Sequence, residues 1–182
     1  MAQEDPNRAG NGSDTGANEP QAATLAQYIK DLSVESPSAP QVFQWQDQPS
    51  VDVNFNLGVE KLSDEVNEVS IKMEVRAQSQ NGVHFLVDLT FAGLFGLRNF
   101  PEEAIPPFLL VEAPRLLFPF ARQIICESIQ NMGFPPLLLE PIDFGAAYMA
   151  QLQAAQQQQQ GEAGASGEAP AEATADEGSG EA

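Results

Sequence analysis

Four segments in which apolar and polar residues alternate constrain the fold of this chain more than any other feature. They cover residues 28–35, 51–57, 69–76 and 84–91. Alternation with a period of two predicts β-strands with one buried face. Asn81-Gly82, between the last two segments, is typical of a hairpin turn. One-sided burial favours an antiparallel sheet with one covered face and one wet face.

The alternation also predicts which side chains share a face of the sheet. In the last three segments the covered face holds Val51, Val53, Phe55 and Leu57; Val69, Ile71, Met73 and Val75; and Phe85, Val87, Leu89 and Phe91. In residues 28–35 the same period predicts that Tyr28, Lys30, Leu32 and Val34 lie opposite Ile29, Asp31, Ser33 and Glu35.

Two amphipathic segments follow the strands. Residues 115–133 carry a wide apolar stripe at helical spacing, with Pro119 either in a first turn or at a kink and Gly133 at the end. A second helix begins after Asp143 and places Phe144, Tyr148 and Leu152 on one stripe. Strands followed by helices predict an α+β fold with a four-stranded antiparallel sheet and both helices on one face.

Composition limits both the folded region and its partners. The chain has 182 residues and a formal charge of -18, which disfavours nucleic acid and anionic membrane surfaces as partners. Residues 1–21 and 153–182 are polar or low in complexity, so we expect disordered tails around one domain at 22–152. The single cysteine, the absence of a signal-like N-terminus and the lack of a long apolar run favour a cytoplasmic protein that does not insert into membranes.

Residues for catalysis or metal binding are scarce. His84 is the only histidine and Cys126 the only cysteine, and the two fall in different predicted elements. A zinc site needs more His and Cys ligands, and the glycine spacing of a phosphate-binding loop is absent. The sequence therefore predicts a protein without enzymatic activity, metal or cofactor.

Apolar residues are concentrated in three segments that lack regular periodicity, at 39–46, 92–101 and 131–144. Prolines and glycines interrupt each of them, so we expect loops. Two interpretations remain open: the loops cover the protein's own core, or they line a groove for another apolar chain. The acids Asp31, Glu35 and Asp88, with Leu86 beside them, likewise form either a solvated face or a docking surface.

Three stretches carry a resemblance to a known family. "KDLSVESPSAPQVF" (30–43), "FLVDLTFAGLF" (85–95) and "LLFPFARQIICESIQNMGFPPLLLEPIDF" (116–144) resemble the SecB family of bacterial protein-export chaperones. The likeness covers residues 25–153 in one order. Trp45 departs from the pattern, because it stands slightly earlier than the tryptophan of the family.

The resemblance implies a function without ATPase chemistry. Such chaperones are homotetramers, built as dimers of dimers, that hold unfolded secretory precursors in hydrophobic grooves and deliver them to the SecA translocase motor. By position, the resemblance implies SecA docking at Asp31, Glu35, Leu86 and Asp88. It implies a client-binding groove at Phe43, Trp45, Leu94, Phe95, Leu97, Phe134 and Tyr148.

Two other functions compete with this one. A carrier of small hydrophobic ligands would use the same apolar cavity and would bind fatty acids or steroids saturably. An enzyme would depend on His84 and Cys126, and replacing both with alanine would abolish its activity.

Overall fold

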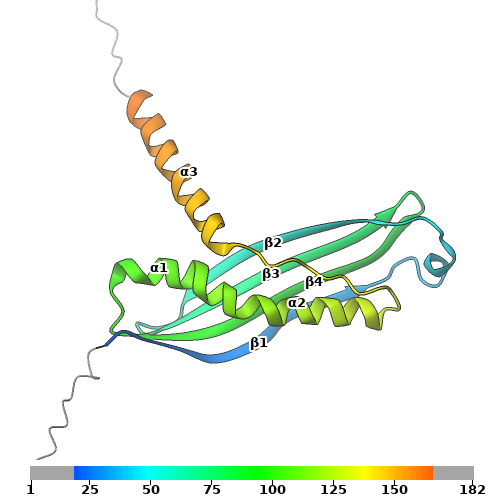
Figure 1. The fold of residues 1–182 in the computed structure, drawn as a ribbon, viewed down its shortest axis with the longest axis horizontal. Coiled ribbons are helices and arrows are strands. Elements are labelled where there is room, and N and C mark those ends of the chain that lie inside the picture. The colour runs from blue at the N-terminus through cyan, green and yellow to red at the C-terminus, as the bar shows by residue number, and fades with distance from the viewer. Residues whose placement is uncertain (1–18, 166–182) are drawn as a thin grey trace, which may run out of the picture. The chain divides into compact units, whose positions relative to one another are not determined.

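A computed structural model of the chain describes residues 19–165. Four strands form one antiparallel sheet in the order β1-β4-β3-β2 (Figure 1). Their bounds are Gln21–Glu35 for β1, Ser50–Lys61 for β2, Val66–Ser79 for β3 and Gly82–Arg98 for β4. The predicted α+β class and the four-stranded antiparallel sheet are confirmed.

The core lies between one face of the sheet and helix α2 (Ala113–Asn131) (Figure 1). The predicted apolar faces of β3 and β4 are buried, and α2 contributes a stripe with Leu117, Ala121, Ile125 and Ile129. The prediction of a buried face on β2 is wrong for most of its length: Val51, Val53 and Phe55 are exposed at the sheet edge, and Leu57 packs against the core. The opposite sheet face, called the open face below, carries most of the charged residues of the strands, among them Glu35, Glu74 and Asp88.

The helical region begins earlier than the amphipathic pattern indicated. A 3-10 turn at Glu102–Ala104, the short α1 (Ile105–Pro107) and a π-helical stretch at Phe108–Glu112 lead without a break into α2. Pro119 is therefore inside the helix rather than in its first turn. Its ring provides no N–H for the carbonyl of Arg115, one turn earlier in the helix.

By length and mean hydropathy alone, Glu102–Asn131 is long enough and apolar enough to cross a membrane. The core helix of a soluble protein passes the same test, and here the inner stripe of α2 packs on the sheet.

The loop predicted at 92–101 is wrong, because β4 continues as far as Arg98. The alternation simply persists through the glycines: Phe91, Phe95 and Leu97 remain buried on the helix side. Glycine is a poor strand former, and that signal was misleading here because Gly93 lies where the sheet and α2 approach closely.

Two bulges in β1 change the faces predicted for residues 28–35. Leu25 and Lys30 each interrupt the pairing with β4, so that Ile29 pairs with Phe91 and Asp31 with Thr90. Leu32 and Val34 lie on the helix side and Asp31, Ser33 and Glu35 on the open face, so these five residues keep the predicted alternation. The predicted faces of Tyr28, Ile29 and Lys30 are reversed, because one extra residue shifts the period.

The chain from Pro135 to Asp143 has no regular structure and leads into α3 (Phe144–Ala165). Within the described residues, Gly145–Ala165 belong to a second compact unit. The helix runs past 152, where the folded region was expected to end, because alanine and glutamine are good helix formers. The rest of the predicted tails, 1–18 and 166–182, lies outside the described residues.

Candidate functional site

An open apolar groove lies between the start of β4, the 3-10 turn Gln41–Gln44 and the chain that follows α2. Its volume is about 520 Å³. Phe43 stacks on Phe134 with ring centroids 5.4 Å apart, and Phe134 lies 5.0 Å from the Phe85 ring. Phe43, Trp45 and Phe134, predicted as groove residues, therefore line one surface, together with Val42, Pro49, Val51, His84, Phe85, Gly133, Pro135, Pro136, Leu137 and the polar Asp47 and Gln48.

Local backbone geometry brings these aromatic side chains together. Val42 is buried and anchors the 3-10 turn, which leaves Phe43 exposed beside it. Gly133 ends α2 with φ +92°, a left-handed conformation that favours glycine. A Cβ at Gly133 would also lie 3.3 Å from Phe43 Cε1, so the groove wall is closely packed there.

The two residues considered for catalysis have separate structural partners. His84 is buried at the base of the groove, where its Nε2 lies 3.0 Å from Ser79 Oγ and its ring meets the Trp45 ring edge-on at 5.0 Å. Cys126 lies on α2, with Sγ 3.8 Å from Gln130 Oε1. Within residues 19–165, no group of three His, Cys, Asp or Glu side chains is placed to hold a metal ion.

Phe95, Leu97 and Leu94, which were also predicted as groove residues, do not line this groove. Phe95 and Leu97 are buried in the core, where the Phe95 ring meets Phe108 at 6.0 Å. Leu94 is half-buried on the open face, paired with Glu68 of β3. Tyr148 belongs to α3, in the second compact unit. The groove that the structure forms is thus built from Phe43, Trp45 and Phe134.

All four residues predicted for docking lie on the open face. Glu35 of β1 pairs with Leu86 of β4, and two residues away Ser33 pairs with Asp88. Asp31 follows in the next row, opposite Thr90. A depression of about 340 Å³ extends from Glu35, Leu86 and Asp88 across to β3 and β2, where Asp52, Asn54, Glu74 and Arg76 line it.

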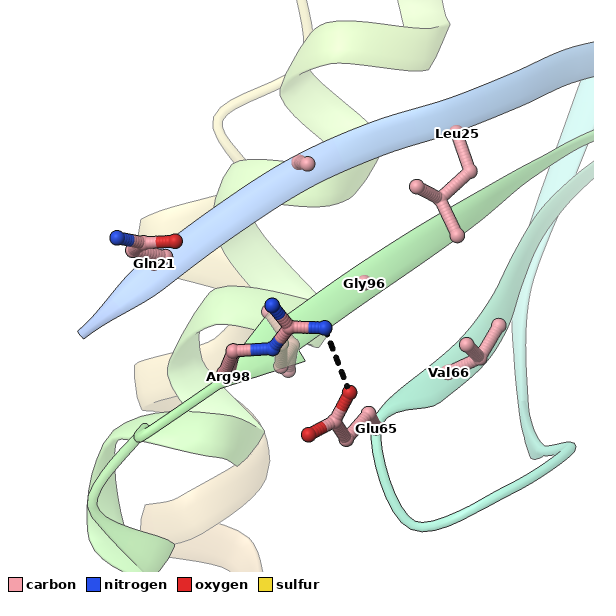
Figure 2. Close-up of a pocket in the computed structure, with 8 residues that line it drawn as sticks. Gln21, Leu25, Glu65, Val66, Gly96 and Arg98 are labelled. Carbon is pink, nitrogen blue, oxygen red and sulfur yellow. Dashed lines mark hydrogen bonds and ion pairs between the residues drawn. The ribbon is translucent and has the colours of Figure 1, made fainter. Parts of the chain in front are cut away.

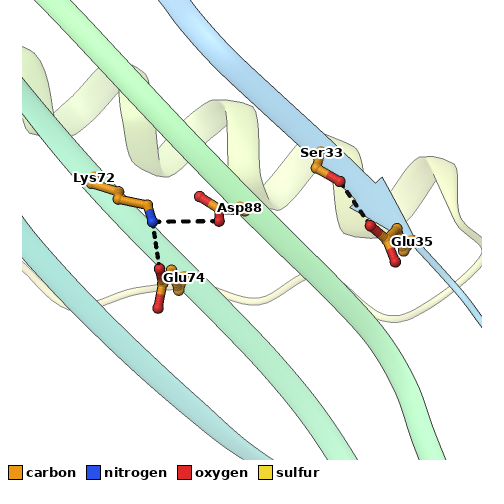
Figure 3. A network of polar contacts seen from close by, with 5 residues as sticks. All are labelled: Ser33, Glu35, Lys72, Glu74 and Asp88. Atoms are coloured by element: carbon orange, nitrogen blue, oxygen red, sulfur yellow. Dashed lines mark hydrogen bonds and ion pairs between the residues drawn. The ribbon is translucent and has the colours of Figure 1, made fainter.

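The charges in this depression are only partly compensated (Figure 3). Lys72 Nζ donates to Glu74 Oε1 at 2.6 Å and lies 3.6 Å from Asp88 Oδ2. The hydrogen bond to Glu74 and the nearby Asp88 carboxylate raise the pKa of Lys72. Lys72, Glu74 and Asp52 were not predicted as docking residues, although their outward positions on alternating strands indicated the same face.

A second polar cluster holds the bulge of β1 in place. Tyr28 and Lys30 both donate to the carboxylate of Glu68, across the width of β4. Glu68 is only 8% exposed, and these hydrogen bonds, from Lys30 first and then Tyr28, lower its pKa. The cluster fixes the strand segment from which Asp31 projects.

The other end of the open face has a smaller, mainly apolar pocket of about 250 Å³ (Figure 2). The bulge residue Leu25 lies over Gly96, whose missing side chain provides the space. Arg98 Nη2 and Glu65 Oε2 form an ion pair 3.2 Å long at its rim. No pattern in the sequence had indicated this pocket, since it depends on the bulge at Leu25.

Comparison with known proteins identifies the family. The model of the family described as preprotein translocase subunit SecB matches residues 15–155. The protein-export protein SecB of Sphingopyxis alaskensis is 48% identical over 159 residues, covering 87% of this chain and 91% of that protein. The protein-export protein SecB of Zymomonas mobilis is 53% identical over 132 residues, which cover 72% of this chain and 80% of that protein.

Among solved structures, a SecB-like chaperone of Mycobacterium tuberculosis, in complex with a peptide from an antitoxin, shares the fold. The TM-score is 0.56 at 21% identity, covering 66% of this chain and 90% of that one. The family match and these relatives extend over most of the chain. The chain therefore belongs to the SecB family of protein-export proteins.

Proposed function

We propose that this protein is an ATP-independent holdase that binds unfolded secretory precursors in its apolar groove and keeps them competent for export. The observation that carries the proposal is the open surface formed by Phe43, Trp45 and Phe134. Exposed apolar surface of this kind marks a binding site rather than a core. The SecB-like chaperone of M. tuberculosis was solved with a polypeptide segment bound, which supports a polypeptide as the ligand class.

The shape of the groove suits clients that share no sequence. Phe43 is 55% exposed and its ring contacts another ring rather than a fixed polar group. Aromatic surfaces that can repack accept many apolar side chains, each with low affinity. We propose that the subunits assemble as a dimer of dimers, so that one long client engages several grooves and is held by avidity.

We also propose that the protein delivers its clients to SecA, and the open face supports this part of the proposal. Asp31, Glu35, Asp88 and the apolar Leu86 lie together on the side of the sheet away from α2. An acidic surface with an apolar anchor suits a partner segment that is basic and carries one apolar side chain. Docking there leaves the groove free to hold a client, and we place the whole process in the cytoplasm.

A carrier of small hydrophobic ligands is the less favoured alternative. Such ligands are bound in cavities that enclose most of their surface. Here Phe43 is more than half exposed, so a fatty acid in the groove would remain largely in contact with water.

Binding to one precursor in two states tests the proposal. A fluorescently labelled precursor, diluted from denaturant, is titrated with the protein, and the folded form of the same precursor is titrated in parallel. We expect saturable binding of the unfolded form and none of the folded form. Equal binding of both forms, or competition by a fatty acid in place of a second unfolded chain, would contradict the holdase function.

A further inference from the structure

Two acidic residues face each other at the centre of the open face. Asp88 of β4 and Glu74 of β3 are direct partners in the antiparallel register. Like charges in directly opposed positions destabilise a sheet. Lys72 is the cation that reaches both of them, since it lies 2.6 Å from Glu74 Oε1 and 3.6 Å from Asp88 Oδ2 (Figure 3).

Lys72 lies closer to the carboxylate of Glu74 than to that of Asp88. The contact with Glu74 has the length of a charge-assisted hydrogen bond, whereas 3.6 Å to Asp88 is too long for one. The other oxygen of Asp88, Oδ1, is shielded from solvent and has no hydrogen-bond partner in the described part of the chain. Asp88 therefore retains an unsatisfied acceptor next to a lysine that does not satisfy it.

We infer that Lys72 is a built-in competitor of the docking partner, an internal counter-ion that a basic side chain of the partner displaces from Asp88 and Glu74. This inference rests on the proposed docking of a basic segment at the open face. It adds a residue that sets the affinity and the salt dependence of that docking.

The exposure and the charge of Lys72 determine how its removal should change the affinity for a basic partner. The side chain of Lys72 is 47% exposed, so its ion pairs add little to stability. Its positive charge nevertheless opposes the approach of a basic partner to the depression formed by Glu35, Asp52, Glu74 and Asp88. Removing that charge leaves Arg76 beside these four acids, so that a basic partner segment meets a more negative surface.

The matched control is Lys61. This residue ends β2, and its ion pair is with Asp64 at 3.1 Å instead of with an acid of the depression. Lys61→Gln and Lys72→Gln change the net charge of the protein equally, so any difference between them depends on position. Lys72→Arg keeps the charge in place and tests whether charge rather than side-chain shape matters.

The experiment measures the affinity of the wild type and the three variants for SecA at low and high salt, with unfolded-precursor binding as the check on folding. We expect Lys72→Gln to bind SecA about two- to fivefold more tightly at low salt, with Lys61→Gln and Lys72→Arg close to wild type. Screening should close this gap at high salt.

Two results would overturn the inference, and they are distinguishable. If the wild type binds SecA and Lys72→Gln binds no more tightly than Lys61→Gln, Lys72 does not compete with the partner for the docking surface. If the wild type takes up unfolded precursor but does not bind SecA, the proposed docking itself is wrong, and the role of Lys72 is wrong with it.

Discussion

Gly93 of β4 lies directly beneath Leu117 of α2. A Cβ built on Gly93 would come within 2.8 Å of Leu117 Cδ2, closer than real Cβ contacts allow. Leu117 is fully buried, so it has little room to move away. The absence of a side chain at Gly93 thus sets how closely α2 packs on the sheet.

Gly93→Ala should therefore destabilise the protein by about 1–3 kcal/mol, the usual cost of overpacking a core. The measurement is the free energy of unfolding from denaturant titration. Gly96→Ala is the control, because a Cβ there would meet Leu25 at an ordinary 3.5 Å. If both variants lose equal stability, strand conformation rather than the contact with Leu117 explains the loss.

The central strands could be predicted because their burial is regular. β3 and β4 are covered on one face along most of their length, so apolar and polar residues alternate with little interruption. β1 could not be predicted in the same way. Its bulges at Leu25 and Lys30 insert single residues, and such an insertion reverses the faces without leaving a compositional signal.

Some of the residues that line the groove could be predicted from the sequence, and others could not. Phe43, Trp45 and Phe134 lie together because prolines and Gly133 force the chain out of regular structure there. The family resemblance implied that Phe95 and Leu97 belong to the same surface, and Gly93 and Gly96 agreed with a loop there. Pairing with Gln27 of β1 and Val69 of β3 places Gly93 in a strand, and these partners are far from it in the sequence.

Glu68 should make stability depend on pH. Its pKa is lowered in the folded state from the ordinary 4.5, because Lys30 and Tyr28 donate to its carboxylate. A depressed pKa contributes stability that is complete above the unfolded value and is lost as the pH falls through the folded value. Glu68→Gln should therefore be less stable than wild type near pH 7, and the difference should shrink below about pH 4.5.

Thermal unfolding of wild type and Glu68→Gln from pH 7 to pH 3 measures this difference. A constant gap across the range would mean that the carboxylate charge contributes nothing and that only side-chain packing was altered.

Phe43→Ala should weaken the binding of unfolded precursor without unfolding the protein. Phe43 is 55% exposed, so its removal leaves no core cavity, but it removes one half of the ring pair with Phe134. Truncation of an aromatic contact residue costs about 1–2 kcal/mol of binding, or roughly five- to thirtyfold in affinity.

Leu62→Ala provides the comparison for Phe43→Ala, since Leu62 is 51% exposed but lies in the turn after β2, outside the groove. Precursor affinity by fluorescence anisotropy distinguishes the two. Equal losses would indicate a general effect of surface hydrophobicity instead of a groove.

Asp88→Lys should reduce SecA affinity by about tenfold or more, because it places a positive charge where a basic partner segment is expected to bind. Asp31→Lys should act in the same direction. Precursor binding should not change in either variant, because both residues lie on the sheet face opposite α2.

Asp64→Lys is the control for charge, as Asp64 is fully exposed in the turn after β2. Parallel titrations with SecA and with unfolded precursor decide the outcome. If Asp88→Lys loses both partners equally, the substitution has damaged the fold and the open face has no separate role in docking.

Light scattering on a sizing column tests the central claim most directly. The protein is run alone and after mixing with a precursor diluted from denaturant, and the folded precursor is run as the reference. We predict a species of four subunits that takes up the unfolded precursor and ignores the folded one. A monomer or dimer that leaves the unfolded precursor to aggregate would contradict the proposed holdase function.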